Sequence, residues 1–314
     1  MVWKFGDHGS SEFVVADGVA FFSTTSKELF AVDTRTGQQI WKISTPDWVY
    51  SDPAVAGGVL FFGCEDGYLY AVDAKTGTEK WKARTGSIVA SSPAISNGVV
   101  YVGTDMPAFL YAIDANTGTV RWKFKAGNTI FSSPTIGDGT IYFGSHDSYL
   151  YAVDLASGQE KWKFKTGDRI QSTVALSGGT VYVGSDDGSL YAVNAQTGKQ
   201  VFAFKAADKV YSSPAVLNGV VYVGSDDGNV YAVDAKTGQE KWRFKTEDLV
   251  ISSPSIAEGI VYVGSNDRHL YALDATTGKE KWKFEVDHYV TSSPKIVDGA
   301  VYFVADGEAL YALR

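Results

Sequence analysis

The sequence predicts an all-β fold, an eight-bladed β-propeller made of four-stranded antiparallel blades. The chain of 314 residues has 33 glycines and 14% aromatic residues but only 2 methionines, which favours many short strands joined by tight turns. A repeat of about 40 residues runs through it, because a large aromatic residue recurs at Trp3, Trp41, Trp81, Trp122, Trp162, Phe202, Trp242 and Trp282. A repeat of this length with four strand patterns is typical of a propeller blade.

One unit shows the four expected strands in order. Residues 130–136 (IFSSPTI) predict the first strand, 140–145 (TIYFGS) the second, 149–154 (YLYAVD) the third and 162–165 (WKFK) the fourth. Between strands, other units carry GSDDG and DAKTG, in which Gly supplies the positive φ that tight turns require. Helical periodicity is missing, so neighbouring strands are expected to pair antiparallel.

The two ends of the chain predict how the ring closes. Residues 2–6 match a fourth strand, whereas residues 290–314 supply three strands and lack the fourth. Pairing the two segments completes an eighth blade and removes two exposed strand edges. We therefore expect residues 1–314 to form one propeller with a seam blade built from 2–6 and 290–314.

One alanine position and one turn motif recur in the units. A position that accepts only alanine indicates that a nearby tryptophan leaves no room for a larger side chain. The alanines are Ala31, Ala71, Ala112, Ala152, Ala192, Ala232, Ala272 and Ala312. An Asp followed three residues later by Thr and then by Gly, as in Asp73, Thr76 and Gly77, is typical of an Asx turn. We interpret these acids as turn residues rather than as catalytic acids or metal ligands.

The motif A-x-D-x-x-T-G-x-x-x-W resembles the tryptophan-docking motif of the pyrroloquinoline-quinone (PQQ) repeat. The resemblance covers nearly the whole chain and implies an eight-bladed propeller, as in the quinoprotein alcohol dehydrogenases. It says less about function, because the same repeat occurs in propellers that bind no quinone. These include the lipoprotein scaffold of the bacterial outer-membrane assembly machinery and sensor domains of bacterial kinases, and family members are often periplasmic or on the cell surface.

The sequence argues against an enzyme. In the quinoprotein dehydrogenases, the resemblance implies PQQ held between a Trp and a disulfide of adjacent cysteines, with Ca²⁺ and an Asp base. Here Cys64 is the only cysteine, and the blades lack the long insertions that build that pocket. No Ser/His/Asp or HExxH signature occurs, and the four histidines are scattered. We expect no catalytic residues, no metal site and no cofactor, with PQQ kept as an alternative.

Positions that vary between units while their neighbours stay constant are the candidates for binding. They lie in two loops per unit, before the first strand and between the second and third, which propeller geometry places around the central funnel. The candidate ligand-binding residues are Trp48, Tyr50, Tyr68, Phe109, Phe131, Tyr149, Arg169, Lys209, Tyr211 and Tyr289. We expect the first six to line one sector of the funnel, as exposed aromatics often mark contact surfaces. The alternative is a plug of aromatics packed on one another.

Charge narrows the choice of partner. The net charge is −8, without a basic cluster, which argues against nucleic acid. More than half of the 36 acidic residues fall in the funnel loops, while GSDDG acids such as Asp186 and Asp226 are interpreted as turn and solubility residues. No stretch of 18 apolar residues and no signal-peptide pattern is present, so we expect no membrane insertion; the compartment stays open.

The resulting hypothesis is a monomeric, non-enzymatic scaffold that recognises a peptide or protein segment at the funnel face. The runner-up is a small-ligand site for a quinone or a sugar, and a quinoprotein-like enzyme comes third.

Overall fold

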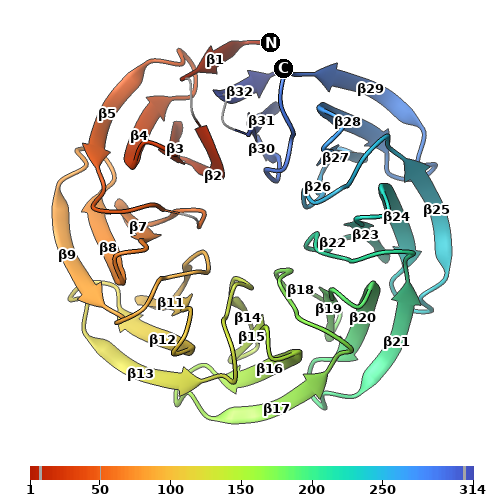
Figure 1. The fold of residues 1–314 in the computed structure, drawn as a ribbon, viewed down its shortest axis with the longest axis horizontal. Helices are drawn as coiled ribbons and strands as arrows, with labels where there is room; N and C mark the ends of the chain where they lie inside the picture. The colour runs from red at the N-terminus through yellow and green to blue at the C-terminus, as the bar shows by residue number, and fades with distance from the viewer. Residues whose placement is uncertain (7–8, 50, 307–308) are drawn as a thin grey trace.

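The computed structural model describes residues 1–6, 9–49, 51–306 and 309–314, and eight four-stranded antiparallel sheets form a closed ring (Figure 1). Blade 1 contains β2 (Gly9–Ala16), β3 (Val19–Thr24), β4 (Glu28–Asp33) and β5 (Gln39–Ser44). Blade 2 contains β6 (Ala54–Ala56), β7 (Val59–Gly63), β8 (Tyr68–Asp73) and β9 (Glu79–Arg84). Blade 3 contains β10 (Ala94–Ser96), β11 (Val99–Gly103), β12 (Phe109–Asp114) and β13 (Val120–Lys125).

Blades 4 to 6 repeat the pattern. Blade 4 contains β14 (Thr135–Gly137), β15 (Thr140–Gly144), β16 (Tyr149–Asp154) and β17 (Glu160–Lys165). Blade 5 contains β18 (Ala175–Ser177), β19 (Thr180–Gly184), β20 (Ser189–Asn194) and β21 (Gln200–Lys205). Blade 6 contains β22 (Ala215–Leu217), β23 (Val220–Gly224), β24 (Asn229–Asp234) and β25 (Glu240–Lys245).

The ring closes through blade 7 and the seam blade. Blade 7 contains β26 (Ser255–Ala257), β27 (Ile260–Gly264), β28 (His269–Asp274) and β29 (Glu280–Glu285). The seam blade contains β30 (Lys295–Val297), β31 (Ala300–Ala305), β32 (Ala309–Leu313) and, as its outer strand, β1 (Trp3–Phe5). Trp3 pairs with Ala312, and the two termini lie side by side (Figure 1). Among the described residues, no helix could span a membrane.

Outside blade 1, the first strands are shorter than the sequence predicts. Residues 130–136 were expected to form one, but β14 covers only Thr135–Gly137. Pro134 has no N–H to donate, and the Ser133 N–H donates to Thr173 Oγ1 of the next blade at 3.3 Å instead of to a neighbouring strand. The third strand agrees with the prediction over residues 149–154, while the fourth begins two residues early, at Glu160.

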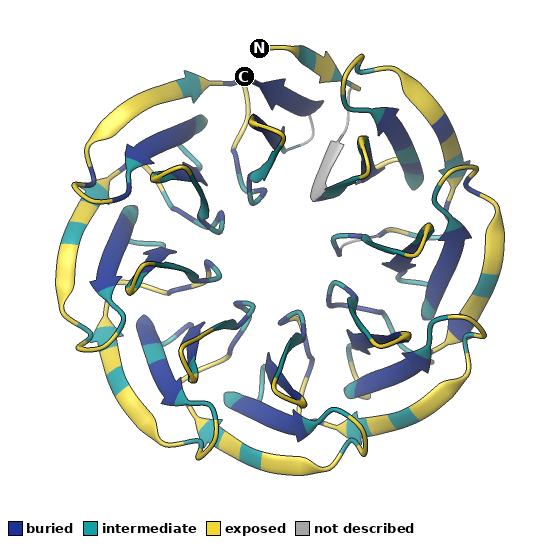
Figure 2. Ribbon diagram, turned by 180° about the vertical axis from the view of Figure 1, so that it is seen from behind, coloured by how far each residue is buried: buried dark blue, intermediate teal, exposed yellow. Residues whose placement is uncertain are grey.

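The core lies between the blades. One buried cluster joins Phe21 and Leu29 of blade 1 to Leu60 and Phe62 of blade 2, and equivalent clusters follow around the ring. Figure 2 shows the result: the third strands are largely buried and the outer strands largely exposed. Each blade is therefore stabilised by its neighbours as well as by its own sheet.

The tryptophans fasten each blade to the next. Trp162 packs on Gly198 of blade 5, where a Cβ would lie 2.8 Å from the ring, and its Nε1 donates to the Ala195 carbonyl at 2.9 Å. In its own blade Trp162 pairs with Ala152, whose small side chain lets the Tyr142 and Trp162 rings approach to 5.8 Å. The predicted steric closure of the alanine position by a tryptophan is present, but Trp162 belongs to the same blade as Ala152, and its contact with the next blade is at Gly198 and Ala195.

The Asx turns are confirmed as structural. Asp73 Oδ1 accepts the N–H groups of Lys75 and Thr76, both at 3.1 Å, and the Thr76 hydroxyl at 3.1 Å. Gly77 follows with φ +73°, a conformation that suits glycine. These acids stand on the face opposite the funnel loops, at the turns between the third and fourth strands.

Candidate functional site

Two loops from each blade form one end of the central channel, which we call the funnel face. In blade 5, the loop after the second strand contacts the loop that enters the blade, because the Asp186 N–H donates to the Arg169 carbonyl at 2.9 Å. The equivalent bond joins Asp226 to Lys209 in blade 6 and Glu65 to Trp48 in blade 2, each at 2.9 Å. The two loops predicted to share a face are therefore hydrogen-bonded to each other.

Buried residues hold the entering loop in place. Val210 is 1% exposed and packs against Gly184, where an added Cβ would lie 2.3 Å from the Val210 carbonyl oxygen. The buried Ser172 hydroxyl accepts the Gly184 N–H at 2.8 Å and donates to the Gly184 carbonyl at 3.0 Å. The alternate residues beside these anchors are consequently presented at the channel in a fixed orientation.

Four of the predicted binding residues are exposed on the funnel face. Trp48, Phe131, Tyr211 and Tyr289 are 40%, 43%, 39% and 52% exposed, and all four lie in entering loops. Trp48 Nε1 donates to the Thr25 carbonyl at 3.2 Å, and the Phe131 ring lies 4.9 Å from the His146 ring. Trp48 and Phe131 are therefore oriented by their neighbours while staying exposed.

Three other candidates are packed between blades. Tyr68, Phe109 and Tyr149 are each partly buried against an inter-blade cluster. Each ring is also covered by an outer-strand lysine, as with Lys165 at 4.5 Å from the Tyr149 ring centre. Unlike Trp48 and Phe131, which are exposed in entering loops, these three rings are thus partly covered, each by an outer-strand lysine. Tyr50 lies outside the described residues.

A polar network at the channel mouth includes residues that the sequence did not single out. Arg169 Nη2 contacts Asp186 Oδ2 at 3.0 Å, and Gln171 Nε2 donates to the same oxygen at 3.1 Å. Asp186 is buried, so it is not the solvated turn residue that was expected. Burial raises the pKa of Asp226, near Lys209, and its buried Oδ1 has no hydrogen-bond partner among the described residues.

The second GSDDG acid does act as a turn residue, as predicted. Asp187 Oδ2 accepts the Tyr191 hydroxyl and the Gly167 N–H, both at 2.7 Å, and its Oδ1 accepts the Ser189 N–H at 2.8 Å. These bonds, the first of them to the tyrosine, offset the effect of burial and lower the pKa of the carboxyl. The two acids of a GSDDG pair therefore differ: the second is held in its turn, whereas Asp186, the first acid in blade 5, contacts Arg169 and Gln171 at the mouth.

Below the mouth, a belt of hydroxyls encircles the channel. The backbone N–H of each of six residues at this level donates to a hydroxyl of the next blade, at 2.8 to 3.3 Å. The hydroxyl belt consists of Ser92, Ser133, Thr173, Ser213, Ser253 and Ser293, with Asp52 before Ser92. The sequence showed the signal as a recurrent second Ser or Thr, which was interpreted only as part of the first strand.

In blade 2 the belt position is occupied by Asp52 instead of a hydroxyl residue, and Asp52 forms an ion pair with the seam blade. Lys295 Nζ contacts Asp52 Oδ2 at 2.9 Å, and Asp52 Oδ1 accepts the Phe13 N–H at 3.0 Å. Lys295 belongs to the seam blade and Asp52 to blade 2, so the lysine reaches across blade 1 and lies 5.7 Å from the Phe13 ring centre. The charge of Asp52 is thereby balanced inside the channel.

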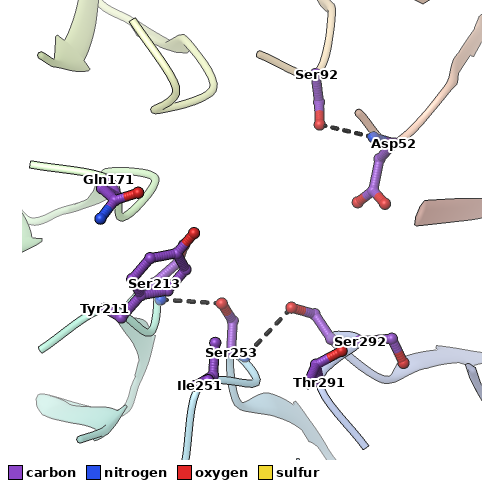
Figure 3. A pocket seen from close by; sticks show the side chains of 10 residues that line it. Asp52, Ser92, Gln171, Tyr211, Ser213, Ile251, Ser253, Thr291 and Ser292 are labelled. Carbon is purple, nitrogen blue, oxygen red and sulfur yellow. Dashed lines mark hydrogen bonds between the residues drawn. The ribbon is translucent and has the colours of Figure 1, made fainter. Parts of the chain in front are cut away.

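A cavity of about 330 Å³ occupies the channel between mouth and belt (Figure 3). Hydroxyls of Ser92, Ser213, Ser253 and Ser293 face it together with the Asp52 carboxylate. Tyr211, Ile251, Gln171 and Thr291 form its wall toward the mouth. Of the candidates predicted from the sequence, Tyr211 alone lies among the described residues that line this cavity.

The channel lacks two features that the resemblance to the quinoprotein dehydrogenases implies for a PQQ site. Cys64 is buried, its Sγ donates to the Asp47 carbonyl at 3.4 Å, and burial raises the pKa of its thiol to about 11. As the single cysteine, it cannot form the disulfide against which the quinone stacks in the dehydrogenases that the repeat resembles. No cationic side chain is among the described residues that line the cavity, so the quinone's carboxylates would lack a counter-charge.

The family of the chain follows from a comparison of its sequence with family models. The model described as outer membrane protein assembly factor BamB matches residues 1–105, 65–168, 146–256 and 246–314. These segments together cover the whole chain. No curated protein sequence matches it.

Solved structures show the same fold in proteins of different function. BamB from Moraxella catarrhalis is 20% identical, with a TM-score of 0.83 over 96% of this chain and 92% of that one. The computationally designed Ika8 protein is 17% identical, with a TM-score of 0.86 over 98% and 96%. Quinohemoprotein alcohol dehydrogenase from Comamonas testosteroni is 18% identical, with a TM-score of 0.84 over 98% and 73%. At these identities the likeness shows the fold alone.

Proposed function

Because this chain belongs to the family of the outer membrane protein assembly factor BamB, we propose that it is a non-enzymatic scaffold that binds a peptide or protein segment at its funnel face. One observation carries the proposal. Trp48, Phe131, Tyr211 and Tyr289, each at least 39% exposed, come from entering loops of four blades and share one end of the channel. Large exposed aromatics in such a group are typical of protein-binding surfaces.

The chemistry of the same face supports a binding role over catalysis. Two of the acids at the mouth are engaged, Asp186 with Arg169 and Asp105 with the Thr129 hydroxyl at 2.5 Å. The His146 ring lies against Phe131 in a tilted arrangement, and burial, with a contribution from Arg169, lowers the pKa of His146. Among the described residues, no group of three or more His, Cys, Asp or Glu side chains could hold a metal ion.

The scaffold hypothesis can be tested by selecting ligands on the protein. Peptides from a random library displayed on phage are selected on the unmodified chain and then measured against variants. Trp48→Ala is expected to weaken binding at least tenfold while changing the free energy of unfolding by no more than about 1 kcal/mol, because an exposed loop residue contributes more to binding than to folding.

Trp282→Ala is the matched control. Trp282 is also a partly exposed tryptophan, at 36%, but it stands on the outer strand β29, away from the funnel face. Peptides that bind this variant and Trp48→Ala equally well would place the binding surface elsewhere and contradict the proposal. Recovery of no binding peptide would contradict it as well.

A further inference from the structure

The hydroxyl belt leaves hydrogen-bonding capacity directed into the channel. Each belt oxygen accepts one backbone N–H, as Ser253 does from Ser213 at 2.9 Å. Among the described residues, no acceptor lies within hydrogen-bond distance of the hydroxyls of Ser92, Ser253 or Ser293. A hydroxyl has one donor and two acceptor lone pairs, so each of these groups can still donate one bond and accept another.

The charges around the cavity exclude strongly ionic ligands. A cation would require an uncompensated carboxylate, but the charge of Asp52 is already balanced by Lys295 at 2.9 Å. An anion would require a cationic side chain, and the described lining residues include none. The buried Asp186 at the mouth would also repel it, although Arg169 reduces that effect. The ligand that best complements this lining is therefore neutral and carries many hydroxyl groups.

The wall of the cavity supplies a surface for the apolar parts of such a ligand. Tyr211 presents its ring on one side, with Ile251 nearby, while Gln171 and Thr291 add polar groups to the lining (Figure 3). An aromatic face next to converging hydrogen-bonding groups suits a sugar, whose C–H faces are apolar and whose edges are polar. A volume of about 330 Å³ is at the small end for ligand pockets, which limits the ligand to a small molecule.

We propose that the channel cavity is a binding site for a neutral polyhydroxylated ligand of monosaccharide size. The belt hydroxyls of Ser92, Ser213, Ser253 and Ser293 bind its hydroxyl groups, and Tyr211 packs against its ring. This site goes beyond the proposed scaffold function: it lies inside the channel, and Trp48 is not part of its lining.

The test uses defined probes and isothermal titration calorimetry on the full chain. The probes are D-glucose, D-galactose, N-acetyl-D-glucosamine and myo-inositol, with acetate and methylammonium as charged comparisons. At least one neutral probe is expected to bind, and neither charged probe. Ser253→Ala is expected to raise the Kd of that probe about three- to tenfold, the effect of one neutral hydrogen bond. Tyr211→Ala is expected to raise it by a similar factor through loss of ring packing.

Ser133→Ala provides a matched control within the belt. Ser133 accepts the Ser92 N–H at 3.1 Å just as Ser253 accepts the Ser213 N–H at 2.9 Å, so both variants lose one equivalent internal bond. Ser133 is not among the residues that line the cavity, so its loss should leave the Kd unchanged. Equal effects of the two serine variants, binding of a charged probe alone, or no binding of any neutral probe would overturn the proposal. Trp48→Ala should bind the probes normally, which separates this result from a failure of the scaffold hypothesis.

Discussion

Replacing a docking tryptophan by alanine should reduce stability by different amounts in different blades, because Trp282 lacks a contact that Trp162 makes. Trp162 packs on the turn of the next blade, with its Nε1 at 2.9 Å from the Ala195 carbonyl. Trp282 should dock in the same way on the seam blade, but there the chain ends replace the turn between third and fourth strands. Consequently Trp282 is 36% exposed and makes no docking hydrogen bond among the described residues.

The expected magnitudes follow from these contacts. Trp162→Ala should cost about 3–5 kcal/mol of unfolding free energy, as for other large core truncations. Both tryptophans contact a tyrosine of their own blade at the same 5.8 Å, so this contribution cancels between them. What Trp282 lacks is one hydrogen bond, about 1 kcal/mol, and burial of one ring face on the turn, roughly another 1 kcal/mol. Trp282→Ala should therefore cost about 2 kcal/mol less.

Blade 5 offers the reverse experiment. Phe202 occupies the docking position there, its ring lies 6.3 Å from Tyr182, and it has no N–H to donate to the Ala235 carbonyl. Phe202→Trp should be neutral or stabilise the protein by up to about 1 kcal/mol. Urea unfolding followed by far-UV circular dichroism measures all three variants without relying on tryptophan fluorescence. Equal losses for Trp162→Ala and Trp282→Ala would refute the docking argument.

Two further predictions concern the seam and acid stability. Deleting residues 1–6 removes β1, and with it the 2.7 Å bond from Trp3 Nε1 to the Thr34 carbonyl and the contacts of Phe5 with Phe22 and Phe30. The deletion should therefore destabilise the protein by roughly 4 kcal/mol or more. An unchanged melting temperature would contradict this prediction. The N–H of Ser157 and other bonds lower the pKa of Asp154 from 3.8 to about 2, so its contribution to stability is present above pH 3.8 and is lost as the pH falls toward 2. Asp154→Asn should lose less stability than the unmodified protein over that range, and parallel melting curves would count against the role of this turn.

The fold was predictable because its signals are local and repeated. A positive-φ turn such as Asn97–Gly98 and the Asx turn at Asp73 are encoded within a few residues and recur around the ring. The extent of the first strand was not predictable in the same way. Whether Ser133 continues a strand depends on Thr173, 40 residues away in the next blade, which accepts its N–H. Local pattern cannot reveal such a partner.

The site was predictable only in part, for a related reason. The variation between units correctly located the funnel loops, but it could not separate exposed Trp48 from half-buried Tyr149, which an outer-strand lysine covers. One overlooked signal was available. Asp52 and Lys295 carry opposite charges at positions where most other units have small side chains, and the structure joins the two at 2.9 Å.

These departures from the repeat matter because a symmetric ring cannot orient a ligand. Eight identical blades would present the same hydroxyl eight times, and a bound molecule could turn among equivalent poses. The Asp52–Lys295 pair replaces the belt hydroxyl at one point, and Tyr211 and Ile251 form an apolar wall in two neighbouring blades. The polar and apolar sides of the cavity thus differ around the ring, which selects one orientation. Residues common to all units build the channel, and residues that differ between units make its sides chemically different.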